Sequence, residues 1–309
     1  MKIYTDSIEF AEKYIDPADW SKIKTNDIQS ELIDFGRGLF TSDIIFEAEI
    51  DFIEGINYLF LVDYAPESQY DALIKFAHNN KTLPDGIVCL AGSGKKFHGF
   101  HNRKWVAKQG NIHLSAYFSP MTKVASLGLG FTIVSALSVM QAIDQIAGLK
   151  DKARVKWVND ILIDGAKVSG VLAHTQIQGE ICSSAIFGIG VNVETSPDSD
   201  PTEFVPKSAC INEFLDQELQ IKQKKVFTNL VERLAGNYTL LISGGYKPLL
   251  QSYVDRSLII GKEVKIMSDI RGEDDKEMLR GKVVGIGENL ELFFEGREEP
   301  VVSGRPVIL

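Results

Sequence analysis

The chain has 309 residues, of which 44% are hydrophobic and 24% are charged, and its formal net charge at pH 7 is −9. These values are typical of a globular protein whose length allows two or three domains. The acidic balance argues against duplex nucleic acid as the main ligand, because phosphates bind to basic surfaces. Cys89, Cys182 and Cys210 are too widely spaced for a disulfide framework or a zinc site, which favours a reducing compartment.

The N-terminal region predicts mixed structure without a recognisable role. Helices are expected at Ser7–Tyr14 and Thr25–Phe35, and neither forms a helix-turn-helix with basic recognition residues. The N-terminus contains acidic residues and no long apolar run, so it does not resemble a secretory signal. Beyond it, strands at Tyr58–Val62 and Ile87–Ala91 flank a helix at Gln69–Asn79.

An uncharged segment from Val124 to Ile143 is about as long as a membrane span. Its large apolar side chains recur at helical spacing, with small and hydroxyl-bearing residues between them. We therefore expect a buried helix at 124–147, packed closely on a sheet, rather than a membrane helix. A strand at Ile112–Phe118 precedes it.

A hairpin over residues 154–172 carries the most informative side chains. Its arms are short apolar runs, and Asp164-Gly165 between them is a strong signal for a tight turn. Asp160 can hold Mg²⁺ through its carboxylate oxygens, and Lys167 can offer a mobile positive charge to a carboxylate or phosphate. In the simpler interpretation Lys156 is a solvated strand lysine, Asp160 caps the turn and Trp157 belongs to the core.

The rest of the chain predicts a change of architecture near Arg256. Before it we expect a strand at Ala185–Val193, followed by a polar surface loop at 194–203 and helices at 224–242 and 247–254. After it come short strands separated by turns, at 257–266, 282–286, 290–294 and 301–309. The charged run 269–280 is expected to be an exposed hairpin loop. This order predicts an α+β main domain and a small C-terminal β-barrel.

The loop at 92–104 concentrates glycine, basic residues and two histidines in an otherwise acidic chain. Such a loop suits a phosphate or acyl-phosphate ligand, although it can equally be a solvated connection between strands. It is not a P-loop, because Cys89 stands at the first glycine position and Lys96 at the Ser/Thr position. His98 and His101 have no acid or cysteine nearby in the sequence to complete a metal site.

Five segments in order resemble the biotin protein ligases, within the wider biotin and lipoate ligase superfamily. They are the loop ending in Arg103-Lys104-Trp105, GNIHLS at 110–115, KWVND at 156–160, KVSGVL at 167–172 and GIGVN at 188–192. The resemblance covers roughly residues 58–309. It implies an α+β fold with a mixed-sheet biotin/lipoate-ligase-like catalytic domain at 51–254 and an SH3-like barrel at 255–309. Residues 1–50 would be an extension of unknown role.

The resemblance implies ATP-dependent activation of biotin to biotinyl-AMP, followed by transfer to a lysine of a biotin carboxyl carrier domain of a carboxylase. Lys167, Asp160 and Arg103 would be catalytic, with Asp160 also the ligand of Mg²⁺. The residues expected at biotin are Ser68, His98, Gly99, Lys167, Gly188 and Gly190. Those expected at ATP or the adenylate are Arg103, Trp105, Asn111, Asn159, Asp160 and Asn192. The family allows a homodimer, and we expect a cytoplasmic enzyme without nucleic-acid or membrane partners.

The ligand-covering loop departs from the family pattern. Where GRGRRGR is usual, this chain has residues 97–103 with only Gly99 and Arg103 kept, and Phe100 replaces an expected arginine. His98 and His101 are candidates to supply the missing charge. Two other functions therefore stay open. One is a ligase for lipoate or another carboxylic acid, and the other is a binding homologue that has lost the loop chemistry.

Overall fold

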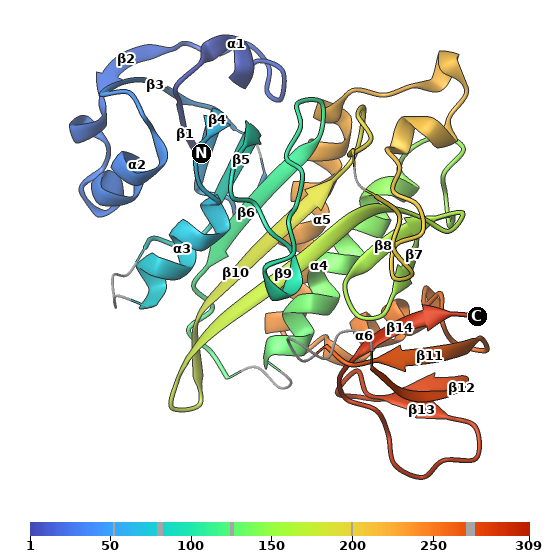
Figure 1. The fold of residues 1–309 in the computed structure, drawn as a ribbon. Coiled ribbons are helices and arrows are strands. Elements are labelled where there is room, and N and C mark those ends of the chain that lie inside the picture. Colours follow the sequence, from blue (N-terminus) through green and yellow to red (C-terminus); the bar gives the residue numbers. More distant parts are fainter. Residues whose placement is uncertain (52, 79–82, 124–126, 199, 270–275) are drawn as a thin grey trace.

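The computed structural model describes residues 1–309 except 52, 79–82, 124–126, 199 and 270–275. A ten-stranded mixed sheet carries helices on both faces, and a four-stranded antiparallel sheet follows at the C-terminal end (Figure 1). The α+β class, the mixed sheet and the small C-terminal β-module expected from the sequence are confirmed. The boundaries proposed between the domains stay a prediction.

The large sheet runs from an N-terminal edge to the hairpin singled out in the sequence. Its strand order is β2 (Ser21–Lys24), β3 (Ile44–Glu49), β1 (Lys2–Thr5), β4 (Tyr58–Ala65), β5 (Ile87–Gly94), β6 (Ile112–Phe118), β10 (Ile181–Val191), β9 (Ala166–Gln178), β8 (Asp160–Ile163) and β7 (Arg154–Lys156). Strand β4 pairs in parallel with β1 and β5, and the other neighbours are antiparallel.

The helices of the described chain are mostly those expected from the apolar periodicity. They are α1 (Ile8–Ala11), α2 (Ile33–Leu39), α3 (Gln69–His78), α4 (Leu127–Asp144), α5 (Gln223–Ile242) and α6 (Tyr246–Asp255). The C-terminal sheet has the strand order β13 (Leu292–Phe294), β12 (Glu277–Ile286), β11 (Glu263–Met267) and β14 (Arg305–Ile308).

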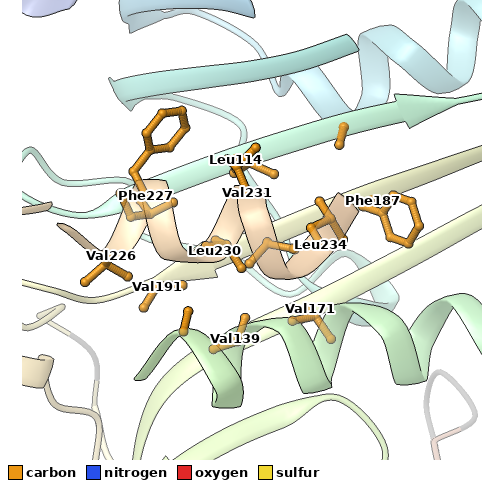
Figure 2. Close-up of a cluster of buried hydrophobic side chains, with 14 of the residues drawn as sticks. Leu114, Val139, Val171, Phe187, Val191, Val226, Phe227, Leu230, Val231 and Leu234 are labelled. Carbon is orange, nitrogen blue, oxygen red and sulfur yellow. The ribbon is translucent and has the colours of Figure 1, made fainter. Parts of the chain in front are cut away.

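The two faces of the large sheet bury separate cores, because side chains alternate across a strand. On β5, Val88 and Leu90 belong to the core under α1, α4, α5 and α6. Their neighbours Cys89 and Ala91 belong to a second core under α2 and α3. Figure 2 shows part of the first core, where α5 lies beside strand side chains and α4. The face under α3 is the one that carries the candidate site.

The uncharged segment is a buried helix, as expected. Within α4, Ser135 and Ser138 each donate a hydrogen bond to the carbonyl four residues earlier, so their hydroxyls are satisfied inside the protein. Asn237 of α5 donates to the Ser138 hydroxyl. The first three residues of the predicted helix 124–147, at 124–126, lie outside the described residues. Among the described helices, none has the length and apolar character needed to cross a membrane.

The N-terminal region differs from expectation. Strands β1, β2 and β3 extend the large sheet beyond β4, whereas the sequence predicted mixed structure there and assigned residue ranges to two helices and no strand. The first expected helix shortens to α1. The second becomes two 3₁₀ turns, Thr25–Asp27 and Ser30–Leu32, before α2. Residues 1–50 therefore share their sheet and cores with the rest of the chain.

The C-terminal strands are also shifted from their predicted positions. Of residues 257–262, expected in a strand, Ser257 forms an isolated bridge with Val155 and 258–262 form bends and turns, so β11 begins at Glu263. Residues 277–280, expected in a loop, open the long strand β12, whose pairing with β11 extends the ladder. The remainder of that predicted loop, 270–275, lies outside the described residues.

Arg256 fixes the junction between the two sheets. Its guanidinium donates to both carboxylate oxygens of Asp144 at 2.8 and 3.1 Å, and to the Ala153 carbonyl at 3.0 and 2.8 Å. The Arg256 carbonyl accepts from Val155 at the start of β7. One side chain thus ties the end of α4 to β7 and to the segment that enters the C-terminal sheet.

Replacing Arg256 with alanine should lower the free energy of unfolding by about 3 kcal/mol, because it leaves the Asp144 carboxylate partly buried without its partner. The free energy of unfolding of Arg256→Lys should lie between those of the parent and of the alanine variant, because an ammonium cannot make both paired hydrogen bonds to the carboxylate. Urea denaturation followed by circular dichroism measures this loss. The exposed Arg280–Glu277 pair on β12 is the control, and Arg280→Ala should change stability little. Equal losses for the two alanine variants would contradict the role given to Arg256.

Candidate functional site

A cavity opens on the α3 face of the sheet. The start of α3, the loop at 97–105, the β8–β9 hairpin and β10 surround it, and its volume counted out to the open mouth is about 740 Å³. Ten residues predicted from the sequence line it: Ser68, His98, Gly99, Arg103, Trp105, Asn159, Asp160, Lys167, Gly188 and Gly190. The structure thus brings together segments that lie more than a hundred residues apart.

Two predicted residues lie outside this cavity. Asn111 is fully buried, and its carboxamide accepts from Val193 and pairs with the backbone of Thr195, so it fixes the chain after β10. Asn192 lines a neighbouring pocket that also contacts Lys167 and Trp105. Its Nδ2 donates to Ala209, while its buried Oδ1 has no hydrogen-bond partner within the described residues. That oxygen is available to a ligand donor.

The β8–β9 hairpin brings Asp160 and Lys167 into contact. Asp164 and Gly165 both have positive φ, as the predicted two-residue turn requires. The Lys167 Nζ lies 2.6 Å from Asp160 Oδ1, and both side chains are about four-fifths buried. The Lys167 backbone is fixed by hydrogen bonds to Lys207 and Ala209. The fixed backbone of Lys167 therefore positions its ammonium at the Asp160 carboxylate.

Lys156 is buried, so the interpretation as a solvated strand lysine is wrong. Only 7% of the residue is exposed, and its ammonium donates to the Phe204 carbonyl. Burial is the main cause that lowers its pKa to about 8; Asp160 opposes this, while Lys167, Arg305 and Arg103 lower the pKa further. The Lys156 ammonium thus interacts with one carboxylate and three other cations, and this excess of positive charge creates a local site for anions in an acidic protein.

Trp157 belongs to a core, as the simpler interpretation predicted, and this core is that of the C-terminal sheet. Its ring packs with Ile259, Val264 and other residues of that sheet, and its Nε1 donates to Leu290 at 2.7 Å. A second pocket lies at this junction and is lined by both Asp160 and Arg305. The C-terminal sheet therefore contributes directly to the surroundings of the hairpin.

The glycines of β10 make room for two aromatic rings. A Cβ on Gly188 would lie 3.0 Å from the Tyr70 ring, and one on Gly190 would lie 2.4 Å from the Trp105 ring. The resemblance implied that both glycines lie at biotin, and glycine in a strand allows a ligand or a backbone to approach closely. In the structure they admit the chain's own aromatic side chains, which form the apolar walls of the cavity.

His113 holds Trp105 in place and was missed from the sequence. The Trp105 Nε1 donates to His113 Nδ1 at 3.2 Å, and His113 Nε2 donates to the Lys108 carbonyl at 2.9 Å. Burial lowers the pKa of His113 to about 4, so the ring is neutral at pH 7. This arrangement fixes the tautomer, with the proton on Nε2. A histidine between apolar strand residues was the available signal.

His98 is tied to an acid that lies far away in the sequence. Its Nε2 lies 2.9 Å from Asp71 Oδ1, and its Nδ1 lies 3.0 Å from the Gly99 carbonyl. Partial burial disfavours the charged ring, but the hydrogen bonds to Gly99 and Asp71 outweigh it and raise the pKa. The loop is thereby anchored to the first turn of α3. No acid stands near His98 in the sequence, and the structure supplies Asp71 from α3 as its hydrogen-bond partner.

Comparisons with known proteins agree with this geometry. Residues 67–192 match the model of the biotin/lipoate A/B protein ligase family. The chain is 26% identical over 230 residues to a bifunctional ligase/repressor of Bacillus subtilis, covering 72% of this chain and 66% of that protein. It is 32% identical over 115 residues to a biotin--[acetyl-CoA-carboxylase] ligase of Paracoccus denitrificans, covering 37% of this chain and 45% of that protein.

Solved structures show the same fold. The biotin protein ligase of Aquifex aeolicus, in complex with biotin and ATP, superposes with a TM-score of 0.62 at 22% identity, covering 81% of this chain and 98% of that one. Residues 67–192, which hold all ten cavity residues, therefore form a domain of the biotin/lipoate A/B protein ligase family. Within that family, the relatives and structural neighbours described above are ligases, and two of the three carry biotin in their names.

Replacing Gly190 with alanine should displace the Trp105 ring, because the new methyl group would overlap it. We expect a changed tryptophan fluorescence spectrum and a loss of about 1–3 kcal/mol in the free energy of unfolding. Gly236→Ala in α5 is the matched control, since its methyl group would meet no atom within 4 Å. That variant should keep the spectrum of the parent and gain up to about 1 kcal/mol in the free energy of unfolding, because alanine favours a helix more than glycine does. An unchanged spectrum in Gly190→Ala would contradict the packing of Trp105 on β10.

Lys156 should make stability depend on pH. Its pKa of about 8 in the folded state lies below the ordinary 10.5, so its charge destabilises the fold below pH 8. This penalty, at most ~3 kcal/mol, disappears as the pH rises towards 10.5, because the unfolded state then binds more protons. Urea denaturation should show this gain in the parent protein and in the exposed control Lys225→Met. Lys156→Met should lack it, and parallel profiles for all three proteins would contradict the burial of this charge.

Proposed function

We propose that the protein is a biotin protein ligase. It activates biotin with ATP to form biotinyl-AMP and pyrophosphate, and it transfers the biotinyl group to a lysine of a biotin carboxyl carrier domain. The observation that carries the proposal is the contact of Lys167 with Asp160 at the cationic end of a cavity walled by Tyr70 and Trp105. Such a cavity suits a ligand with an apolar body and an anionic end.

The first step joins two anions, which is why the cations matter. A carboxylate oxygen of biotin attacks the α-phosphorus of ATP, and the bond to the leaving pyrophosphate breaks with its electron pair. Lys167, Arg103 and Lys156 surround the place where this charge gathers, as the shared effect on the Lys156 pKa indicates. Fixed positive charge that needs no reorganisation stabilises such a transition state. Lys167 would exchange Asp160 for the acyl-phosphate oxygens.

In the second step, the amine of the carrier lysine attacks the acyl carbon of biotinyl-AMP. The bond to AMP breaks, AMP leaves with the electron pair, and the amine gives up a proton. Lys167 is placed to stabilise the oxyanion that forms at the acyl carbon. Trp105, held by His113, would shield the mixed anhydride from water.

The two halves of the ligand would lie on opposite sides of Lys167. The biotin ring would reach Ser68, Gly188 and the His98–Gly99 segment at the α3 end of the cavity. The adenylate would extend towards the neighbouring pocket, which contains Asn192 and contacts both Lys167 and Trp105.

Two asparagines would support the nucleotide indirectly. Asn159 donates to the Val171 carbonyl and so locks the arms of the hairpin. Asn111 fixes the chain that follows Asn192. Both would therefore preserve the shape of the adenylate site rather than provide its main contacts.

Mg²⁺ would accompany ATP at Asp160. Among the described residues that line the cavity, Asp160 is the single acid, and the described chain holds no cluster of three metal-binding side chains. This suits Mg²⁺, which is commonly held by one or two carboxylates together with substrate phosphates and water. When bound, the ion would neutralise phosphate charge. Asp160 would then bind the ion, while Lys167 would contact the acyl group.

Cellular setting and assembly complete the proposal. The three cysteines are free and buried, which fits a cytoplasmic, reducing environment. In the described chain β8 pairs with β9 no further than Gly170, so the outer part of β9 keeps an open edge with Ile177 half-exposed. Such an edge supports a homodimer formed by strand pairing. We also propose residues 51–254 and 255–309 as the catalytic domain and barrel.

With biotin, ATP and Mg²⁺, the protein should add one biotinyl group to a purified carrier domain, as measured by intact-mass spectrometry. Lys167→Ala should lower the initial rate by at least ~10²-fold, because it removes a charge that acts in both transition states. Lys150→Ala, at an exposed lysine outside the cavity, should keep the parent rate. Circular dichroism checks that both variants are folded.

Pyrophosphate exchange separates this proposal from the alternatives. Exchange with biotin, and none with lipoate or octanoate, is expected. Exchange with lipoate or octanoate alone would identify another acyl ligase. Biotin binding by calorimetry without exchange would identify a binding homologue, and either outcome would overturn the proposed function.

A further inference from the structure

Two histidines meet on the α3 face of the sheet, outside the cavity. His78 is the last residue of α3, and His174 lies on β9, 96 residues further along the chain. Their Nε2 atoms are 3.2 Å apart, and the ring centroids are 5.2 Å apart with an interplanar angle of 48°. Neither side chain lines the candidate active site. The proposed ligase reaction therefore does not use this pair.

The spacing of the two nitrogens suits a shared metal ion. Imidazole nitrogens bind Zn²⁺ at about 2.0–2.1 Å, so two of them lie roughly 3.3 Å apart on a tetrahedral ion and roughly 2.9 Å apart at a right angle. The observed 3.2 Å falls between these values. The two Nε2 atoms are the ring nitrogens that approach each other. A hydrogen bond between two neutral rings is the competing explanation.

The electrostatic surroundings also suit a cation. Burial, and then the neighbouring His78, lower the pKa of His174, which weakens the proton that would compete with a metal ion. With two protein ligands, the ion would keep water in its other positions and exchange readily.

We propose that His78 and His174 form a reversible binding site for a divalent transition metal of the class that prefers imidazole, such as Zn²⁺, Ni²⁺ or Cu²⁺. The ion clips the C-terminal end of α3 to β9. These elements also carry cavity residues, Ser68 and Tyr70 at the start of α3 and Gly170–Leu172 on β9. Metal binding would therefore hold one wall of the cavity against another, whatever reaction the cavity performs.

Copper binding tests the site directly. The full-length protein should take up one Cu²⁺ per chain by calorimetry, and electron paramagnetic resonance should show two nitrogen ligands. His78→Gln and His174→Gln should each lose one nitrogen from the spectrum and weaken binding at least tenfold. Zn²⁺ should raise the melting temperature of the parent protein and not of these variants. Circular dichroism without metal checks that both are folded.

His98→Gln is the matched control, because it removes another imidazole that is paired with a metal-binding side chain. It should leave copper affinity and the two-nitrogen spectrum unchanged. The proposal would be overturned by equal affinity in the His78 and His174 variants, by loss of the spectrum in His98→Gln, or by no binding at millimolar Cu²⁺. Each of these outcomes is independent of the ligase assay.

Discussion

The contact between Lys167 and Asp160 is the interaction around which the molecule is organised. One carboxylate offsets a concentration of positive charge that Lys156, Arg103 and Arg305 increase. At an effective dielectric of about 20, like charges about 4 Å apart repel by roughly 4 kcal/mol, so such a cluster persists only when the surrounding fold enforces it. Burial is the main cause of the lowered pKa of Lys156, and the neighbouring cations lower it further. An anionic ligand would reduce this repulsion.

Two different parts of the fold hold the charged cluster in place, one on each side of the cavity. On one side, β9 and β10 form a long ladder backed by the core under α4 and α5, so the hairpin that carries Lys167 has a rigid base. On the other side, the covering loop is held by single contacts, His98 to Asp71 and Trp105 to His113. A rigid sheet beneath a loop that is held by few contacts allows a ligand to enter the site and then be enclosed.

Features encoded by neighbouring residues could be predicted from the sequence. The Asp164-Gly165 turn, the buried helix α4 and strand β6 follow from local spacing, and the motif order indicated which segments converge. Features that depend on distant partners could not. Strand β1 pairs with β4 more than fifty residues later, and its short apolar run predicts no partner. The hydrogen bond of the Lys156 ammonium is to Phe204, and that of His98 Nε2 is to Asp71; both partners are distant in the sequence.

The position of Trp157 has a consequence for how this fold can be divided. Its ring belongs to the core of the C-terminal sheet, yet Trp157 stands three residues before Asp160, between β7 and β8 of the large sheet. The core of the small sheet therefore includes the side chain of Trp157 from the large sheet. The hairpin in turn depends on the apolar residues of the small sheet that bury this ring. The two parts cannot be exchanged between relatives as independent modules. A barrel taken from a relative would pack correctly only if its core accommodated the indole of Trp157. The residues on both sides of this contact must therefore change together.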